Sequence, residues 1–170
     1  MAIVSGDIDF HGSGGTGETD PNAWLGGVRS TTQVTDNSDN NLFADVSGAE
    51  ASAGSTKFRC IYYENAHGSL TLQAAFLWIE TNTTSADDTI RIGLDLVGLN
   101  GTADTIADED TAPSPAVTFS TAANKGAGLS LGNVPTLQHY AFWIERVVDA
   151  ASSALAANSF VLEIEGDTNA

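Results

Sequence analysis

Apolar and polar side chains alternate along two stretches of the chain, TIRIGLDL (89–96) and SFVLEIE (159–165). A period of two places the apolar side chains on one face of an extended strand and the polar side chains on the other. Both stretches are therefore predicted to form strands with one buried face and one solvated face. The apolar positions that share a face are Ile90, Ile92, Leu94 and Leu96 in the first stretch and Phe160, Leu162 and Ile164 in the second.

Other segments have the same period but are apolar on both sides, which indicates strands in the middle of a sandwich or strands that face a partner. Turn-forming Gly, Pro and Asn residues separate them. Only DAASSALAAN (149–158) has a helical composition, and both a helix and a loop with one helical turn fit it. The pattern predicts an all-β fold, a single antiparallel β-sandwich or jelly-roll-like domain. The segments that are apolar on both sides are 57–65, 69–80, 116–120 and 136–148.

Two of these segments share the pattern T-L-Q-x-x-x-x-W-I-E, at residues 71–80 and 136–145. The spacing is too long for a solenoid repeat. It predicts two similar long strands in related places of the two halves of a sandwich, and chance similarity between β-forming sequences is the alternative. Trp78 and Trp143 are predicted to anchor the core, because each brings a large apolar area into its strand.

Residues 1–35 differ in composition, and we expect them to form an extended glycine-rich N-terminal arm in front of a β-sandwich domain of residues 36–170. Seven of the 17 glycines fall between Gly6 and Gly27, among Ser, Thr, Asp and Pro. An arm of this kind either covers the sheet edge of its own domain or reaches a neighbouring subunit. Its apolar residues, which are the candidate interaction residues, are Ile8, Phe10, Trp24 and Leu25.

Acidic residues dominate the charge, with 22 Asp and Glu against 6 Lys and Arg and a net charge of -16 at pH 7. Such a surface repels phosphate backbones and anionic lipid, so we expect neither nucleic acid nor a membrane as a partner. Cys60 is the only cysteine, which excludes an internal disulfide and a thiolate metal site and predicts a small apolar residue in a strand. The opening residues MAIVSGDIDF lack the basic and apolar regions of a signal peptide, so we expect synthesis in a cytoplasm without export.

Two glycine motifs match known catalytic or binding signatures but lack their context. Gly12, Gly14 and Gly17 spell G-x-G-x-x-G, yet Glu-Thr-Asp-Pro follows where a helix would have to receive a pyrophosphate. We therefore interpret these glycines as a source of flexibility. GLSLG (128–132) matches the nucleophile elbow around Ser130, but the Asn-Val-Pro that follows cannot open a long helix at once. Gly128 and Gly132 are interpreted as bends that bracket a short strand.

The histidines and the acidic loops are the remaining candidates for chemistry. No two histidines have the spacing of a metal-binding pair, so we interpret all three as solvated or packed imidazoles, at His11, His67 and His139. Two acidic loops, 35–45 and 103–110, carry the oxygen ligands that calcium prefers, although neither has the EF-hand pattern. The weak calcium candidates are Asp36, Asp39, Asp104 and Asp108. No motif indicates a cofactor.

Several phrases along the chain resemble small structural proteins encoded among the virion genes of tailed bacteriophages. The phrases are DPNAWLGGVRSTT (20–32), LFADVSGAEASAG (42–54), IGLDLVGLNGTADTIADEDTAP (92–113) and SFVLEIEGDT (159–168). The resemblance implies an all-β virion component without catalytic residues, and it brings no motif that distinguishes head from tail.

We therefore expect a non-enzymatic capsid decoration or cement protein, made in the host cytoplasm and bound to the outer surface of the head. Its partners would be the major capsid protein and copies of itself, as a homotrimer or homodimer, with the arm as a clasp. The negative charge suits an outer surface better than contact with packaged DNA. The alternatives are a tail, baseplate or fibre component that recognises a host-surface glycan, and an enzyme acting on cell-wall glycan, which would need an acidic pair in a cleft.

Overall fold

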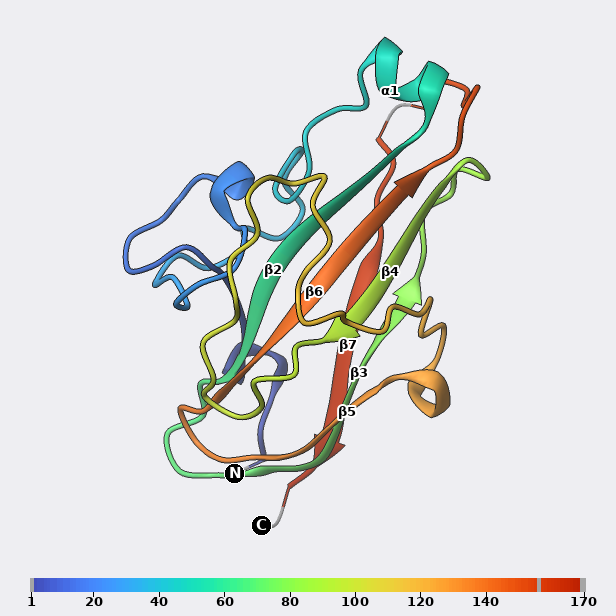
Figure 1. Ribbon diagram of the computed structural model, residues 1–170. Helices are drawn as coiled ribbons and strands as arrows, with labels where there is room; N and C mark the ends of the chain where they lie inside the picture. The colour runs from blue at the N-terminus through green and yellow to red at the C-terminus, as the bar shows by residue number, and fades with distance from the viewer. Residues whose placement is uncertain (1, 156, 169–170) are drawn as a thin grey trace.

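The computed structural model describes residues 2–155 and 157–168 as a β-sandwich, in which two antiparallel sheets of four and three strands pack together. The predicted all-β sandwich is confirmed (Figure 1). The strands are β1 (Ile8–Gly12), β2 (Ser55–Asn65), β3 (Leu72–Thr81), β4 (Asp88–Leu94), β5 (Leu129–Val134), β6 (His139–Val148) and β7 (Val161–Asp167). The short helices are α1 (Gly48–Ala53) and the 3-10 turns η1 (Ser5–Asp7), η2 (Pro21–Ala23) and η3 (Lys125–Ala127).

The two strands that share the T-L-Q-x-x-x-x-W-I-E pattern lie in different sheets. The larger sheet has the order β1-β2-β6-β4 and the smaller sheet the order β5-β3-β7, so β6 and β3 each lie between two neighbours. Their repeated tryptophans face different layers, because Trp78 packs between the sheets and Trp143 packs in a second cluster on the other face of the larger sheet. Trp78 and Trp143 are both buried, as expected for core anchors.

The sandwich core forms where the apolar faces of the two sheets meet. In the register of the larger sheet, Ile61 of β2 pairs with Phe142 of β6, and Ile92 of β4 pairs with Ile144, two residues along β6. They pack with Leu77 and Ile79 of β3 in one buried cluster. Alternation along the strands thus places one side chain of every two in this core.

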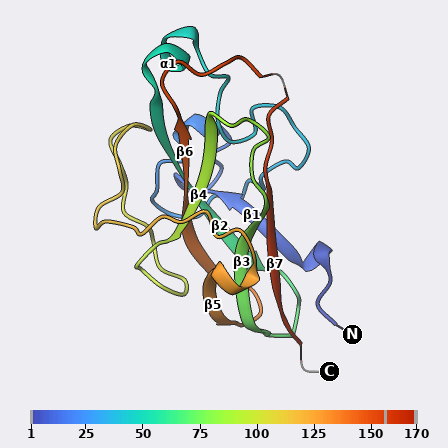
Figure 2. The same cartoon turned by 90° about the vertical axis from the view of Figure 1, so that its right-hand side faces the viewer.

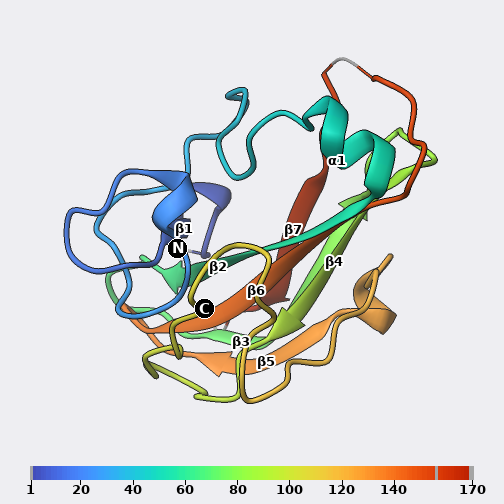
Figure 3. The same ribbon diagram turned by 45° about the horizontal axis from the view of Figure 1, so that its top comes forward.

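A second apolar cluster explains why β2 and β6 are apolar on both faces. Phe58, Cys60 and Trp143 point to the other side of the larger sheet, where Ala103 and Ile106 cover them. Figures 2 and 3 show the loops of residues 95–120 on this side, away from β3 and β7. The second face is therefore closed by the chain's own loops.

The predicted arm is part of the sandwich. Strand β1 pairs with β2, and Ile8 and Phe10 pack against the sandwich core. Trp24 lies in the same core with 2% of its surface exposed, and Leu25 packs against the second cluster. Of the two alternatives for the arm, this chain shows the first, in which the arm covers its own sheet edge: the Trp24 carbonyl accepts the N–H of Cys60 at 2.8 Å, beyond the end of β1.

The structure differs from the sequence predictions at two segments. Residues 116–120 make only an isolated bridge, where Ser120 and Ile92 exchange backbone hydrogen bonds of 2.9 and 3.0 Å and cover the edge of β4. Leu96 does not share the core face with Ile92, because β4 ends at Leu94 and the chain turns. Leu96 is 66% exposed.

Helix formation also differs from expectation. In the described part of 149–158 no helical turn forms, because Ser152 donates its N–H to the Ala51 carbonyl at 2.9 Å instead of to its own segment. The α-helix is α1, which the strand pattern did not predict. A capping box starts it: Ser47 accepts the N–H of Glu50 at 3.2 Å, and Glu50 accepts the N–H of Ser47 at 2.7 Å.

Candidate functional site

The G-x-G-x-x-G segment forms turns and no phosphate site. Strand β1 ends at Gly12, and the next helix is the three-residue η2, so no helix N-terminus faces the glycines. Gly14 and Gly17 adopt φ angles of 97° and 84°, which favour glycine. Gly12 has another reason to be glycine, because a Cβ there would lie 2.2 Å from the Trp24 ring. The interpretation of Gly12 as flexible is therefore wrong, and close packing explains it.

Ser130 lies within a strand and not at a strand-to-helix turn. Strand β5 continues from Leu129 through Val134, and Ser130 pairs with Phe76 of β3. His139 is on β6, in the other sheet. A nucleophile elbow needs a sharp turn that lifts the serine above the sheet, so Ser130 has the geometry of an ordinary exposed strand residue.

The three histidines occupy three different environments. His67 caps a turn, since its Nδ1 accepts the N–H groups of Ser69 and Leu70 at 3.1 and 3.0 Å. His139 packs edge-on against Tyr62, with ring centroids 5.3 Å apart. His11 is buried, and neither ring nitrogen has a hydrogen-bond partner. Burial and the Arg29 charge lower the pKa of His11, so its neutral form is favoured.

The acidic loops use their carboxylates to hold turns. Asp36 accepts the N–H of Asn37 at 2.9 Å, and Asp108 accepts the Thr111 hydroxyl at 2.7 Å. Within residues 2–155 and 157–168, no three His, Cys, Asp or Glu side chains lie close enough to hold one metal ion. Calcium binding at Asp36, Asp39, Asp104 and Asp108 stays a prediction.

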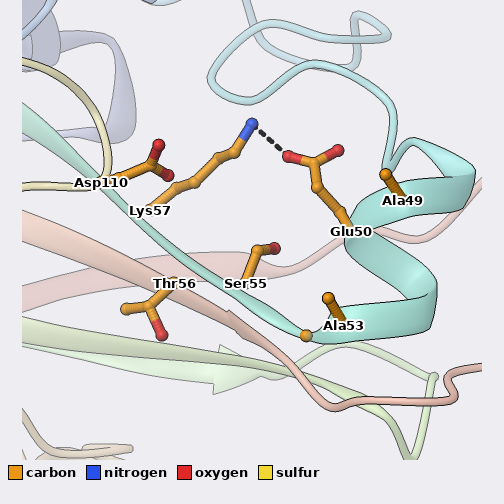
Figure 4. A pocket seen from close by; sticks show the side chains of 8 residues that line it. Ala49, Glu50, Ala53, Ser55, Thr56, Lys57 and Asp110 are labelled. Carbon is orange, nitrogen blue, oxygen red and sulfur yellow. Dashed lines mark ion pairs between the residues drawn. The ribbon is translucent and has the colours of Figure 1, made fainter.

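An open hollow of about 550 Å³ lies between α1 and the start of β2. Figure 4 shows Glu50 of α1 turned toward Lys57 of β2, with Asp110 on the opposite rim. Lys57 pairs with Glu50 and also lies 2.6 Å from Glu109. Glu109 pairs in turn with Arg59, whose side chain is fully buried. Glu50, Lys57, Glu109 and Arg59 therefore form one connected network of ion pairs beside the hollow.

The pKa shifts of Glu50, Lys57 and Glu109 favour the charged form of each group. Hydrogen bonds from Lys57 and Ser47 lower the pKa of Glu50 to about 2. Burial disfavours the charge of Lys57, but its bonds to Glu109 and Glu50 outweigh burial and raise its pKa. Burial likewise opposes ionisation of Glu109, and the bonds to Lys57 and Arg59 lower its pKa nonetheless. A group whose pKa lies far from 7 is a poor proton donor or acceptor at pH 7. The network is therefore suited to joining α1 and a loop to β2.

The largest group of exposed apolar side chains lies at the end of the sandwich opposite α1. Three come from the loop after β4 and one from the turn between β5 and β6, which closes this end of the molecule (Figure 1). Asn100 ties the loop to β6, since its N–H bonds to the His139 carbonyl at 2.8 Å and its Oδ1 accepts the His139 N–H at 3.1 Å. We call this surface the apolar end, and its residues are Leu96, Val97, Leu99 and Leu137.

Sequence analysis missed the apolar end, although a signal for it exists. The segments 65–79, 96–103 and 126–144 contain no Asp, Glu, Lys or Arg, in a chain with 28 such residues. Hydrogen bonds join all three at this end, as when Leu137 donates its N–H to the Asn65 carbonyl at 2.7 Å. Long uncharged segments in an acidic chain are a sequence signal for a surface that contacts another molecule.

Comparisons with protein-family models, with curated proteins and with solved structures find no match for this chain. No helix in the described residues is long and apolar enough to cross a membrane. The geometry of the site and the sequence resemblance are therefore the grounds on which a function can be argued.

Proposed function

We propose that the chain is a non-enzymatic structural protein of a tailed-bacteriophage virion, which decorates the outer surface of the capsid as a cement protein. It binds the major capsid protein and copies of itself. The resemblance of its phrases to virion structural proteins supports the virion assignment. The observation that carries a binding role is the apolar end, where Leu96 and Leu137 are 66% and 62% exposed.

Exposed leucines on one end of a strongly charged protein indicate a contact surface. Burying a leucine side chain in a contact contributes roughly 1.5–3 kcal/mol. The chain carries a net charge of -16, and charged side chains at the centre of a contact have to be desolvated at a cost. The apolar end combines exposed apolar area with uncharged surroundings, which is the composition of an interface core.

The buried polar groups support a structural role. Trp143 donates its indole N–H to Asp95 at 2.7 Å, and Arg146 pairs with Asp88 at 2.7 Å. Burial raises the pKa of the Cys60 thiol, which favours the unreactive protonated form. The two polar pairs stabilise the fold, and a protonated thiol is a poor nucleophile.

The charge supports the outer face of the particle as the location. A chain with a net charge of -16 is repelled by the phosphates of packaged DNA, whose charge dominates the interior of a head. Solvent on the outside screens this charge within about 10 Å at moderate salt. Electrostatic repulsion is therefore weaker for an acidic protein on the outer surface of the head than for one beside the packaged DNA.

Copy number in purified virions tests the proposal. Quantitative mass spectrometry against the major capsid protein should find this chain at a comparable number of copies, because a cement protein follows the capsid lattice. A content of a few per cent would assign the chain to the tail, baseplate or fibre. Its absence from particles would overturn the virion proposal.

A further inference from the structure

The apolar end is fixed in shape, which is the first requirement of a docking surface. The Asn100 pair with His139 holds the loop that carries Leu96, Val97 and Leu99. The Leu137 N–H bond to the Asn65 carbonyl, at 2.7 Å, holds the neighbouring turn. The exposed leucines therefore stand on a surface whose backbone is already ordered, so binding costs little conformational entropy.

The charge around this surface is the second observation. Asp95, next to Leu96 in the sequence, is buried and accepts both the Trp143 indole N–H and the Val97 N–H, at 2.7 and 3.0 Å. Glu64, next to Asn65, is paired with Arg29 at 2.8 Å. On the rim, Asp7 lies near Ala66, whose N–H bonds to the Asp7 carbonyl at 2.9 Å. The three segments that form this end carry no ionised acid or base, whereas the chain as a whole carries -16.

We infer that the apolar end is the surface on which a second copy of this chain docks, end to end and related by a two-fold axis. Two copies of net charge -16 repel each other in most orientations. Contact through the apolar end joins two uncharged surfaces and keeps the acidic α1 ends far apart. A cationic partner would instead be attracted to the acidic remainder of the surface, so the charge pattern favours a second copy. The inference rests on the proposed role as a self-associating virion component.

Sedimentation velocity of the purified chain over a range of concentration and salt tests this inference. We expect a reversible dimer that becomes tighter as salt screens the repulsion between the acidic surfaces. The variants Leu96→Glu and Leu99→Glu place a carboxylate in the contact and should weaken dimerisation roughly 10- to 100-fold. Leu155→Glu is the matched control and should dimerise like the wild type. Leu155 is 52% exposed, and it follows Ser152, whose N–H bonds to the Ala51 carbonyl of α1 at 2.9 Å, at the other end of the molecule.

Two outcomes would overturn the inference. The wild-type chain could stay monomeric at high salt and concentration, or Leu155→Glu could weaken dimerisation as much as Leu96→Glu does. A monomeric chain whose Leu96→Glu variant no longer binds capsids would assign the apolar end to the shell protein. Circular dichroism of each variant checks that the fold is retained. Absence from virions with an intact dimer would contradict the proposed function and leave the docking surface established.

Discussion

The indole ring of Trp24 lies so close to Gly12 that a Cβ at this position would stand 2.2 Å from Cε2 of the ring. The next nearest atoms, Nε1 and Cδ2 at 2.3 and 2.6 Å, also belong to the ring. The ring is buried in the sandwich core and cannot rotate away freely. A single glycine thus lets the arm bring its tryptophan into the domain.

Gly12→Ala should lower the free energy of unfolding by about 1–3 kcal/mol, since the added methyl group forces the ring or β1 to move. Urea denaturation followed by fluorescence measures the change. Gly6→Ala is the control, because a Cβ there meets nothing within 4 Å, and it should stay within about 0.5 kcal/mol of the wild type. Equal effects at the two positions would contradict the packing explanation.

Asp95→Ala should lower the free energy of unfolding by about 1–3 kcal/mol, because it leaves the buried indole N–H of Trp143 without an acceptor. A double-mutant cycle with Trp143→Phe measures the hydrogen bond itself. The two substitutions should be less damaging together than the sum of their separate effects, since phenylalanine has no N–H to satisfy. Strict additivity would show that the bond contributes nothing.

Stability should decrease as the pH falls from 7.5 through the ordinary pKa of histidine. Burial and Arg29 lower the pKa values of His11 and His139 in the folded chain. Below about pH 6.5 the unfolded chain therefore binds more protons than the folded chain, and folding becomes less favourable. Urea denaturation at a series of pH values between 7.5 and 5.5 measures this slope.

The double variant His11→Gln/His139→Gln should flatten that slope. Glu145 acts in the opposite direction, because burial raises its pKa and makes the folded chain the stronger proton binder as the pH falls. Its contribution stays in the double variant, so the difference between the two curves isolates the histidines. An unchanged slope would rule out the two imidazoles as its source.

Lys57→Met should return the pKa of Glu50 from about 2 toward its ordinary value, because the hydrogen bond from Lys57 is the largest cause of the shift. A carboxyl NMR titration measures this pKa directly. The substitution also leaves Glu109 with only Arg59 as an ion-pair partner, and we expect a stability loss of about 0.5–1 kcal/mol for a partly exposed pair. Lys125→Met is the control: Lys125 pairs with Glu165 at 2.7 Å, away from α1, so this variant should leave the pKa of Glu50 unchanged.

The strands were predictable because burial imposes a period of two on the sequence. The two strands that carry the repeat around Trp78 and Trp143 are both interior strands, one in each sheet. The second apolar cluster was not predictable, because loops that cover a sheet have no period that marks them. Leu96 shows the same limit: it continues the alternation of β4, but Asp95 bonds to Trp143 and the chain leaves the sheet.

Sequence patterns alone did not show that Trp24 is buried or that Leu137 is exposed. Trp24 lies in a glycine-rich segment with the composition of a flexible arm. Its ring is buried because Gly12 leaves room for it, and no local sequence pattern connects these two residues. Leu137 occurs in a segment with the alternation of a strand, yet it has a φ of 58° in a turn. At both Trp24 and Leu137, tertiary contacts override the structure that the local sequence pattern indicates.

The loops that pair with the outer strands of the larger sheet also determine how copies can be crowded together. Val34 donates its N–H to the Phe10 carbonyl on the β1 side at 2.8 Å, and Ser120 bonds with Ile92 on the β4 side. These backbone groups are therefore already hydrogen-bonded and cannot pair with a strand from another copy. Many copies of this chain can therefore be packed at high local density without their larger sheets merging into amyloid-like ribbons.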